Sequence, residues 1–199
     1  MKMDLPADPD LMPPPFAEGL DDWARGDGTP DSPTYDRDPA ARLARGDADF
    51  GICLELRKTD AVQRLRYMGE LPVRRGAFIA ITARVKALRG PLCMAQIAAW
   101  PGGAGARGVD DLATTGPLLR LPEHGAAVEF SAVIGPEPRI GVDLVWDARV
   151  LYAHVGLDLI GPEGGVVRIA DLAVRDVTHA FTPAGRGLPG FAPQPAGGR

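Results

Sequence analysis

The side chains that most often carry out catalysis are scarce in this sequence and lie far apart along it. Its three histidines, His124, His154 and His179, form no pair with the spacing of a zinc-binding motif. Its two serines, Ser32 and Ser131, occur in no nucleophile motif of the G-x-S-x-G type, so a hydrolase triad is not expected. The sequence therefore predicts a protein without a catalytic centre.

The carboxylates and glycines give no stronger sign of catalysis. Glu129, Asp143 and Asp158 alternate with apolar neighbours, which is typical of the solvated face of a sheet rather than of a cleft with paired acids. The glycine-rich segment 102–105 lacks the Lys-Ser/Thr pair and the following helix of a phosphate-binding loop.

Another group of residues is suited to binding sugars. Arg66, Arg84, Tyr152 and His154 occupy the polar side of alternating segments, and Trp100 ends such a segment beside a long loop. Sugars bind by stacking their apolar faces on aromatic rings while polar side chains bond their hydroxyl groups. These five residues are therefore the candidate glycan site, and a merely solvated sheet face is the alternative.

The elements that carry these residues are about eight short strand-like runs between Phe50 and Val177. Apolar and polar residues alternate with a period of two over 77–87, which indicates a strand and argues against a helix. In 166–177 the phase of the alternation reverses, which predicts a β-bulge near Ala170–Asp171. Strands at this spacing predict an all-β fold, an antiparallel β-sandwich of the jelly-roll type.

The sequence divides into this sandwich, 40–181, and two extended arms. Residues 1–39 are a proline-rich acidic arm that leads into the first strand, and 182–199 are a Gly/Pro-rich tail. The first 40 residues hold ten acidic and three basic residues, a net charge of −7 in a chain of total charge −4. Such arms are not expected to fold alone, so we expect other copies or other proteins of a large assembly to hold them, a solvated linker being the alternative. The arm residues expected to contact these partners are Leu11, Met12, Phe16, Leu188 and Phe191.

The cysteines, the net charge and the hydropathy of the sequence limit the partners and the cellular compartment that we expect. Cys53 and Cys93 lack metal-ligand spacing. Cys93 shares a strand face with Ile97 and is expected to be a small core residue, although a disulfide between the two cysteines stays open. The net charge of −4 favours neither nucleic acid nor an anionic membrane as a partner. No signal peptide follows Met1 and no apolar run approaches the length of a membrane span, so we expect cytoplasmic synthesis.

Three segments resemble the carbohydrate-binding modules that have the galactose-binding-like jelly-roll fold. Phe16–Trp23 resembles the opening F-E-x-G-L-x-x-W pattern of that family, with Ala17 where the family often has an acid. The segment 67–86 is similar to the family's second and third strands, and 168–174 to its closing strand. The resemblance implies a jelly roll that binds carbohydrate. It also implies a structural calcium ion with Glu18 and Asp171 as ligands.

The arms, the composition and the small sandwich together resemble a second group, the head spikes of alphaproteobacterial gene transfer agents. This resemblance implies a non-catalytic attachment component on the surface of a virion-like particle, a head spike or capsid decoration protein that binds cell-surface polysaccharide. A free-standing or enzyme-associated carbohydrate-binding module is the alternative. A small sandwich enzyme, such as a polysaccharide lyase, is the least favoured.

Overall fold

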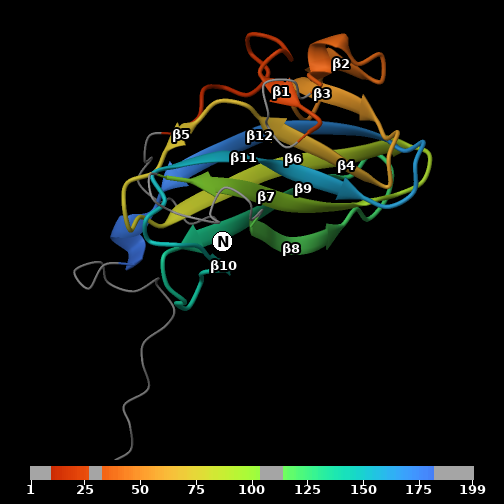
Figure 1. Cartoon of the computed structure of the whole chain (residues 1–199). Helices are drawn as coiled ribbons and strands as arrows, with labels where there is room; N and C mark the ends of the chain where they lie inside the picture. Colours follow the sequence, from red (N-terminus) through yellow and green to blue (C-terminus); the bar gives the residue numbers. More distant parts are fainter. Residues whose placement is uncertain (1–9, 27–32, 104–113, 182–199) are drawn as a thin grey trace, which may run out of the picture.

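The computed structural model describes residues 10–26, 33–103 and 114–181, which form two six-stranded sheets stacked face to face (Figure 1). All the strand pairs are antiparallel except β9 with β10, so the predicted all-β sandwich is confirmed. The β11 sheet contains β1 (Trp23–Ala24), β4 (Val62–Tyr67), β11 (Tyr152–Ile160), β7 (Met94–Gly102) and β8 (Thr114–Arg120), with β5 (Leu71–Pro72) also paired to β11. The β6 sheet contains β10 (Leu144–Val145), β9 (Ala127–Gly135), β6 (Ile79–Arg89), β12 (Val166–Asp176), β3 (Gly51–Arg57) and β2 (Ala41–Asp47). Two 3₁₀ turns, η1 (Tyr35–Arg37) and η2 (Thr178–Phe181), complete the described elements.

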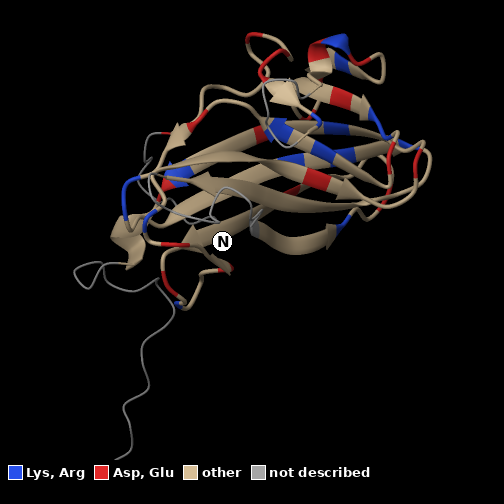
Figure 2. Ribbon diagram, viewed as in Figure 1, with Lys and Arg blue, Asp and Glu red and all other residues tan. Residues whose placement is uncertain are grey.

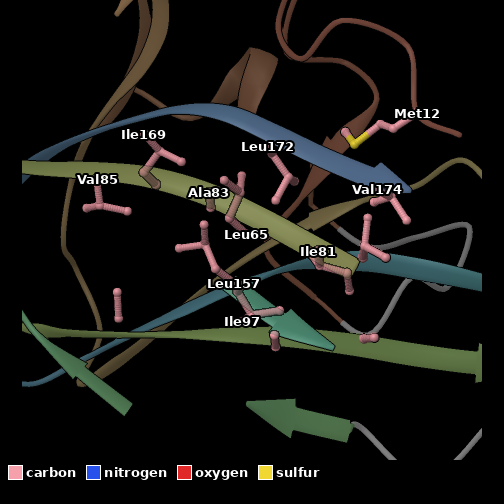
Figure 3. Close-up of a cluster of buried hydrophobic side chains, with 14 of the residues drawn as sticks. Met12, Leu65, Ile81, Ala83, Val85, Ile97, Leu157, Ile169, Leu172 and Val174 are labelled. Carbon is pink, nitrogen blue, oxygen red and sulfur yellow. The ribbon is translucent and has the colours of Figure 1, made fainter. Parts of the chain in front are cut away.

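The alternation seen in the sequence builds the core between the sheets. Ile81, Ala83 and Val85 of β6 face Ile97 of β7 and Leu157 of β11 across the interface (Figure 3). All of these side chains are buried, because successive residues of a strand point to opposite faces and the apolar set meets the other sheet. The core thus spans the middle of the sandwich and leaves the outer faces of both sheets for polar residues.

The predicted β-bulge is present in β12. The register between β12 and β6 shifts between Ala170 and Ala173, and Asp171 has a left-handed backbone conformation with φ +52°. Ile169 is the last β12 residue paired with β3, so the strand has a free edge beyond the bulge. The bulge confirms that the reversed alternation in the sequence marks a change in backbone register.

The N-terminal segment occupies this free edge of β12. The amide of Leu11 donates to the carbonyl of Val174 at 2.7 Å, and the amide of Val174 donates to Asp10 Oδ1 at 2.9 Å. These bonds place Met12 in the core next to Leu172 and Val174 (Figure 3). The described part of the acidic arm is therefore attached to its own domain.

Aromatic residues of the same arm close one end of the core. The ring of Phe16 lies 4.5 Å from that of Trp23, which in turn lies 5.3 Å from Tyr67 of β4. Phe16 and Trp23 are each only 2% exposed, and Tyr35 is fully buried. The expectation that Met12 and Phe16 contact another protein is wrong in this structure, because both side chains are internal.

Three of the predicted partner-contact residues remain, Leu11, Leu188 and Phe191. Leu11 is half-buried and packs against the same core, so it too contacts its own domain. Leu188 and Phe191 lie outside the described residues.

Both cysteines are free, buried thiols, so the disulfide alternative is not realised. Cys93 lies in the central core, whereas Cys53 lies in a smaller cluster with Phe50 and Ala170. Burial raises the pKa of each thiol. Cys93 is thus a small core residue, as predicted, and Cys53 is buried as well.

Charged residues of both signs are interspersed along the strands (Figure 2). On the outer face of the β6 sheet, five of them form one continuous network. Lys86 Nζ lies 2.8 Å from Asp47 Oδ1, and Arg168 bonds both Asp47 and Glu55. Arg42 holds the other oxygen of Glu55 at 2.6 Å. The network joins β2, β3, β12 and β6, and so ties the edge hairpin to the centre of its sheet. Among the described residues, no helix is long and apolar enough to cross a lipid bilayer.

Candidate functional site

The outer face of the β11 sheet brings four of the five predicted glycan-site residues onto neighbouring strands. The pairing of β11 with β7 places His154 opposite Trp100, and its pairing with β4 places Gly156 opposite Arg66. Tyr152 lies two residues before His154 on the same face. We call the surface formed by Arg64, Arg66, Trp100, Tyr152, His154 and Asp158 the Trp100 face.

Arg84, the fifth predicted residue, is not part of this face. It lies on β6 in the other sheet, where its guanidinium bonds Asp171 Oδ2 at 2.9 Å and the carbonyl of Asp49 at 3.0 Å. These two bonds connect the bulge of β12 to the turn between β2 and β3.

Two arginines cover the indole of Trp100. The guanidinium carbons of Arg64 and Arg66 lie 5.0 and 4.8 Å from the centre of its ring, the geometry of cation–π contacts. Trp100 is only 6% exposed as a result. The expected open tryptophan platform is therefore not present. Arg66 is itself only 6% exposed, so the guanidinium group that a ligand meets at this point is that of Arg64.

Asp158 fixes the position of one of these arginines. Arg64 Nε lies 3.0 Å from Asp158 Oδ1 and Arg64 Nη2 lies 3.2 Å from Oδ2, a bidentate ion pair. Asp158 is 5% exposed, so it is a buried anchor rather than the solvated residue that the sequence indicated. The pair forms because Arg64 and Asp158 are register partners on β4 and β11, which local sequence does not reveal.

The two rings at the other end of the face are arranged edge to face. The rings of Tyr152 and His154 are 6.2 Å apart at an interplanar angle of 83°. Gly102 on the adjacent strand makes room for the phenol, because a Cβ there would lie 2.3 Å from the Tyr152 ring. Tyr152 is half-buried and stays accessible at the surface.

His154 is a neutral polar group within this face. Burial lowers the pKa of the imidazole, and the positive charge of Arg66 lowers it further. Its Nδ1 atom is buried and has no hydrogen-bond partner among the described residues. The face thus offers the guanidinium group of Arg64, a neutral imidazole and one accessible phenol ring.

The predicted calcium ligands gain no support from their surroundings. Glu18 lines a hollow of about 120 Å³ with Asp22 and Tyr67, and does not share it with Asp171. The carboxylate of Asp171 is already paired with Arg84. No group of three or more His, Cys, Asp or Glu side chains converges in the described parts of the chain. These residues do not fit a ready-made calcium site, and calcium binding stays a prediction.

The two-sheet architecture is the one found in carbohydrate-binding modules. No protein-family model and no curated protein matches the sequence. The fold is similar to that of the CBM22-1 xylan-binding domain of Paenibacillus barcinonensis Xyn10C. The TM-score is 0.57 at 13% identity, over 86% of this chain and 97% of that domain.

A second similar structure is the C-terminal family 22 carbohydrate-binding module of Clostridium thermocellum Xyn10B. Its TM-score is 0.52 at 14% identity, over 83% of this chain and 93% of that module. At these identities the similarity shows a shared fold. It does not show the resemblance to a particle spike.

Proposed function

We propose that this protein is a non-catalytic carbohydrate-binding protein that holds a polysaccharide against the Trp100 face. The observation that carries the proposal is the assembly of a phenol, an imidazole and two guanidinium groups on adjacent strands of one outer face. The fold shared with a xylan-binding domain and with a family 22 carbohydrate-binding module supports a polysaccharide ligand.

In this proposal the residues of the face have separate roles. Tyr152 offers its ring to the apolar side of a sugar, and Arg64 and His154 bond sugar hydroxyl groups. Arg66, which is 6% exposed, supports the site from below by packing on the indole of Trp100. Asp158 holds Arg64 in place through its bidentate pair, so less side-chain freedom is lost on binding.

Replacing Tyr152 by Ala is expected to weaken polysaccharide binding about fivefold, since one aromatic contact contributes about 1 kcal/mol. Affinity electrophoresis or calorimetry with xylan and a panel of bacterial polysaccharides measures the effect. Thr82→Ala, on the outer face of the other sheet, is the matched control and should bind like the unchanged protein. Equal binding by Tyr152→Ala, or no binding to any member of the panel, would remove the proposal.

A finer proposal is that the domain attaches to a phage-like particle. The observation in its favour is the acidic surface of the folded N-terminal segment, where Glu18, Asp21, Asp22 and Asp36 are all exposed. Such a surface is complementary to a basic docking partner.

In this proposal the full chain should sediment with particles from the cells that make it, and Asp21→Lys with Asp22→Lys should release it. The measurement is immunodetection across a density gradient. The matched control, Asp143→Lys with Asp147→Lys, changes the charge equally elsewhere and should still sediment. A full chain found only in the monomeric fraction contradicts attachment.

A further inference from the structure

A second surface feature lies on the outer side of the β6 sheet, away from the Trp100 face. It is a hollow of about 310 Å³ between the segment 39–41, β3 and the ends of β6 and β12. We call it the basic hollow, and its side chains are those of Arg42, Glu55, Arg57, Arg89 and Val166.

The single acid of the basic hollow is fully occupied. Glu55 Oε1 accepts hydrogen bonds from Arg42 at 2.9 and 2.6 Å, and Oε2 accepts from Arg168 at 3.0 and 2.7 Å. Burial acts to raise the pKa of Glu55, but these bonds outweigh it and lower the pKa. Glu55 is 8% exposed, and each of its carboxylate oxygens is already bonded to Arg42 or Arg168. It therefore has no oxygen free to pair with a third arginine.

Arg57 and Arg89 carry the positive charge of the basic hollow that Glu55 does not balance. Both are exposed, and neither forms an ion pair or side-chain hydrogen bond within the described residues. The strand register sets Arg57 and Arg89 on either side of Val166, which is 6% exposed and forms an apolar floor. Two strand spacings separate their Cα atoms by about 10 Å. Side chains of this length can therefore converge on one ligand group between them.

We propose that the basic hollow binds the carboxylate or sulfate groups of an acidic polysaccharide, with Arg57 and Arg89 as the contacting residues. A guanidinium group matches the planar fork of a carboxylate or two oxygens of a sulfate, which an ammonium group does not. Arg42 lies at the wall, where its pairing with Glu55 holds it in position and balances its charge, so Arg57 and Arg89 supply the net positive charge. The choice of a polysaccharide as the source of the anion rests on the proposed function.

The test compares alginate, a polyuronate, and dextran sulfate with uncharged dextran and with xylan, at constant ionic strength. Arg57→Gln with Arg89→Gln is expected to bind the acidic polymers at least tenfold more weakly than the unchanged protein. Arg57→Lys with Arg89→Lys keeps the charge and should give an intermediate affinity, because the bidentate geometry is lost. Arg45→Gln, an exposed arginine on the opposite face of β2, is the matched control and should bind normally. Thermal unfolding confirms that each variant is folded.

Three outcomes overturn the inference: equal binding by the double Gln variant, an equal loss in Arg45→Gln, and equal binding to DNA, which would indicate non-specific attraction. The result is separable from that of the Trp100 face. Acidic binding that needs Arg57 and Arg89 but not Tyr152 supports the basic hollow even if the Trp100 face binds nothing. Binding that needs Tyr152 alone supports the proposed function and removes this inference.

Discussion

A chain that lacks residues 1–39 is expected not to fold. The deletion removes β1 and the 3₁₀ turn η1, and it takes Phe16, Trp23 and Tyr35 out of the core. Loss of one large buried aromatic side chain costs about 3–5 kcal/mol, and a domain has a total stability of about 5–15 kcal/mol. Removing three such residues together should exceed what the rest of the domain can supply. Circular dichroism and urea titration measure the outcome.

A single substitution in the same segment gives a graded form of this prediction. Phe16→Ala should lower the free energy of unfolding by about 3–5 kcal/mol, because the cavity opens beside Trp23. Pro14→Ala, at an exposed position two residues earlier, should change it by less than about 1 kcal/mol. If the deleted chain instead folds with an unchanged unfolding midpoint, the arm is accessory, and its apolar residues again become candidates for partner contacts.

Asp47→Asn is expected to destabilise the domain by about 3 kcal/mol at pH 7, within the range measured when one partner of a buried ion pair is removed. The Asp47 side chain is only 2% exposed and lies between Lys86 and Arg168, whose charges it balances. Asp49 still contacts Lys86 in the variant, so the loss is partly compensated. Urea unfolding followed by fluorescence gives the difference in the free energy of unfolding.

The contribution of Asp47 to the free energy of unfolding should disappear in acid. Burial acts to raise the pKa of this carboxyl group, but hydrogen bonds from Lys86 and Arg168 outweigh it and hold the pKa well below that of a free aspartate. A carboxyl with a depressed pKa in the folded state contributes stability above its unfolded pKa of about 3.9. That contribution is complete above about pH 5 and is lost as the pH falls through the folded pKa.

The difference between Asp47→Asn and the unchanged protein should therefore shrink as the pH is lowered from 5 toward 2. Asp171→Asn is the control, because Asp171 is 52% exposed in its ion pair and asparagine tolerates the same left-handed backbone. Its effect should stay below about 1 kcal/mol. A difference for Asp47→Asn that is constant with pH would show that lost packing, and not charge, causes the destabilisation.

The strands with clear alternation, such as β6, and the β-bulge could be predicted from the sequence because their signals are local. Residues two apart share a strand face, so the alternation over 77–87 indicates which side chains meet the core. The reversal at Ala170–Asp171 is read in the same way, since an extra residue moves all later side chains to the other face. The burial of Cys93 was likewise predictable, because it shares a strand face with Ile97.

The sequence by itself thus determined an all-β fold and the apolar faces of the strands with clear alternation, but not β1 and β2, which precede Phe50. Only the tertiary structure decided which side chains are covered by distant segments. Met12 enters the core because β3 leaves an edge of β12 free. Trp100 is covered because two arginines of β4 lie over its ring. The same is true of Asp158 and of the basic hollow, which join residues distant in the chain. Contacts of this kind depend on strand order and register between segments, and those are set by the packing of the whole chain rather than by neighbouring residues.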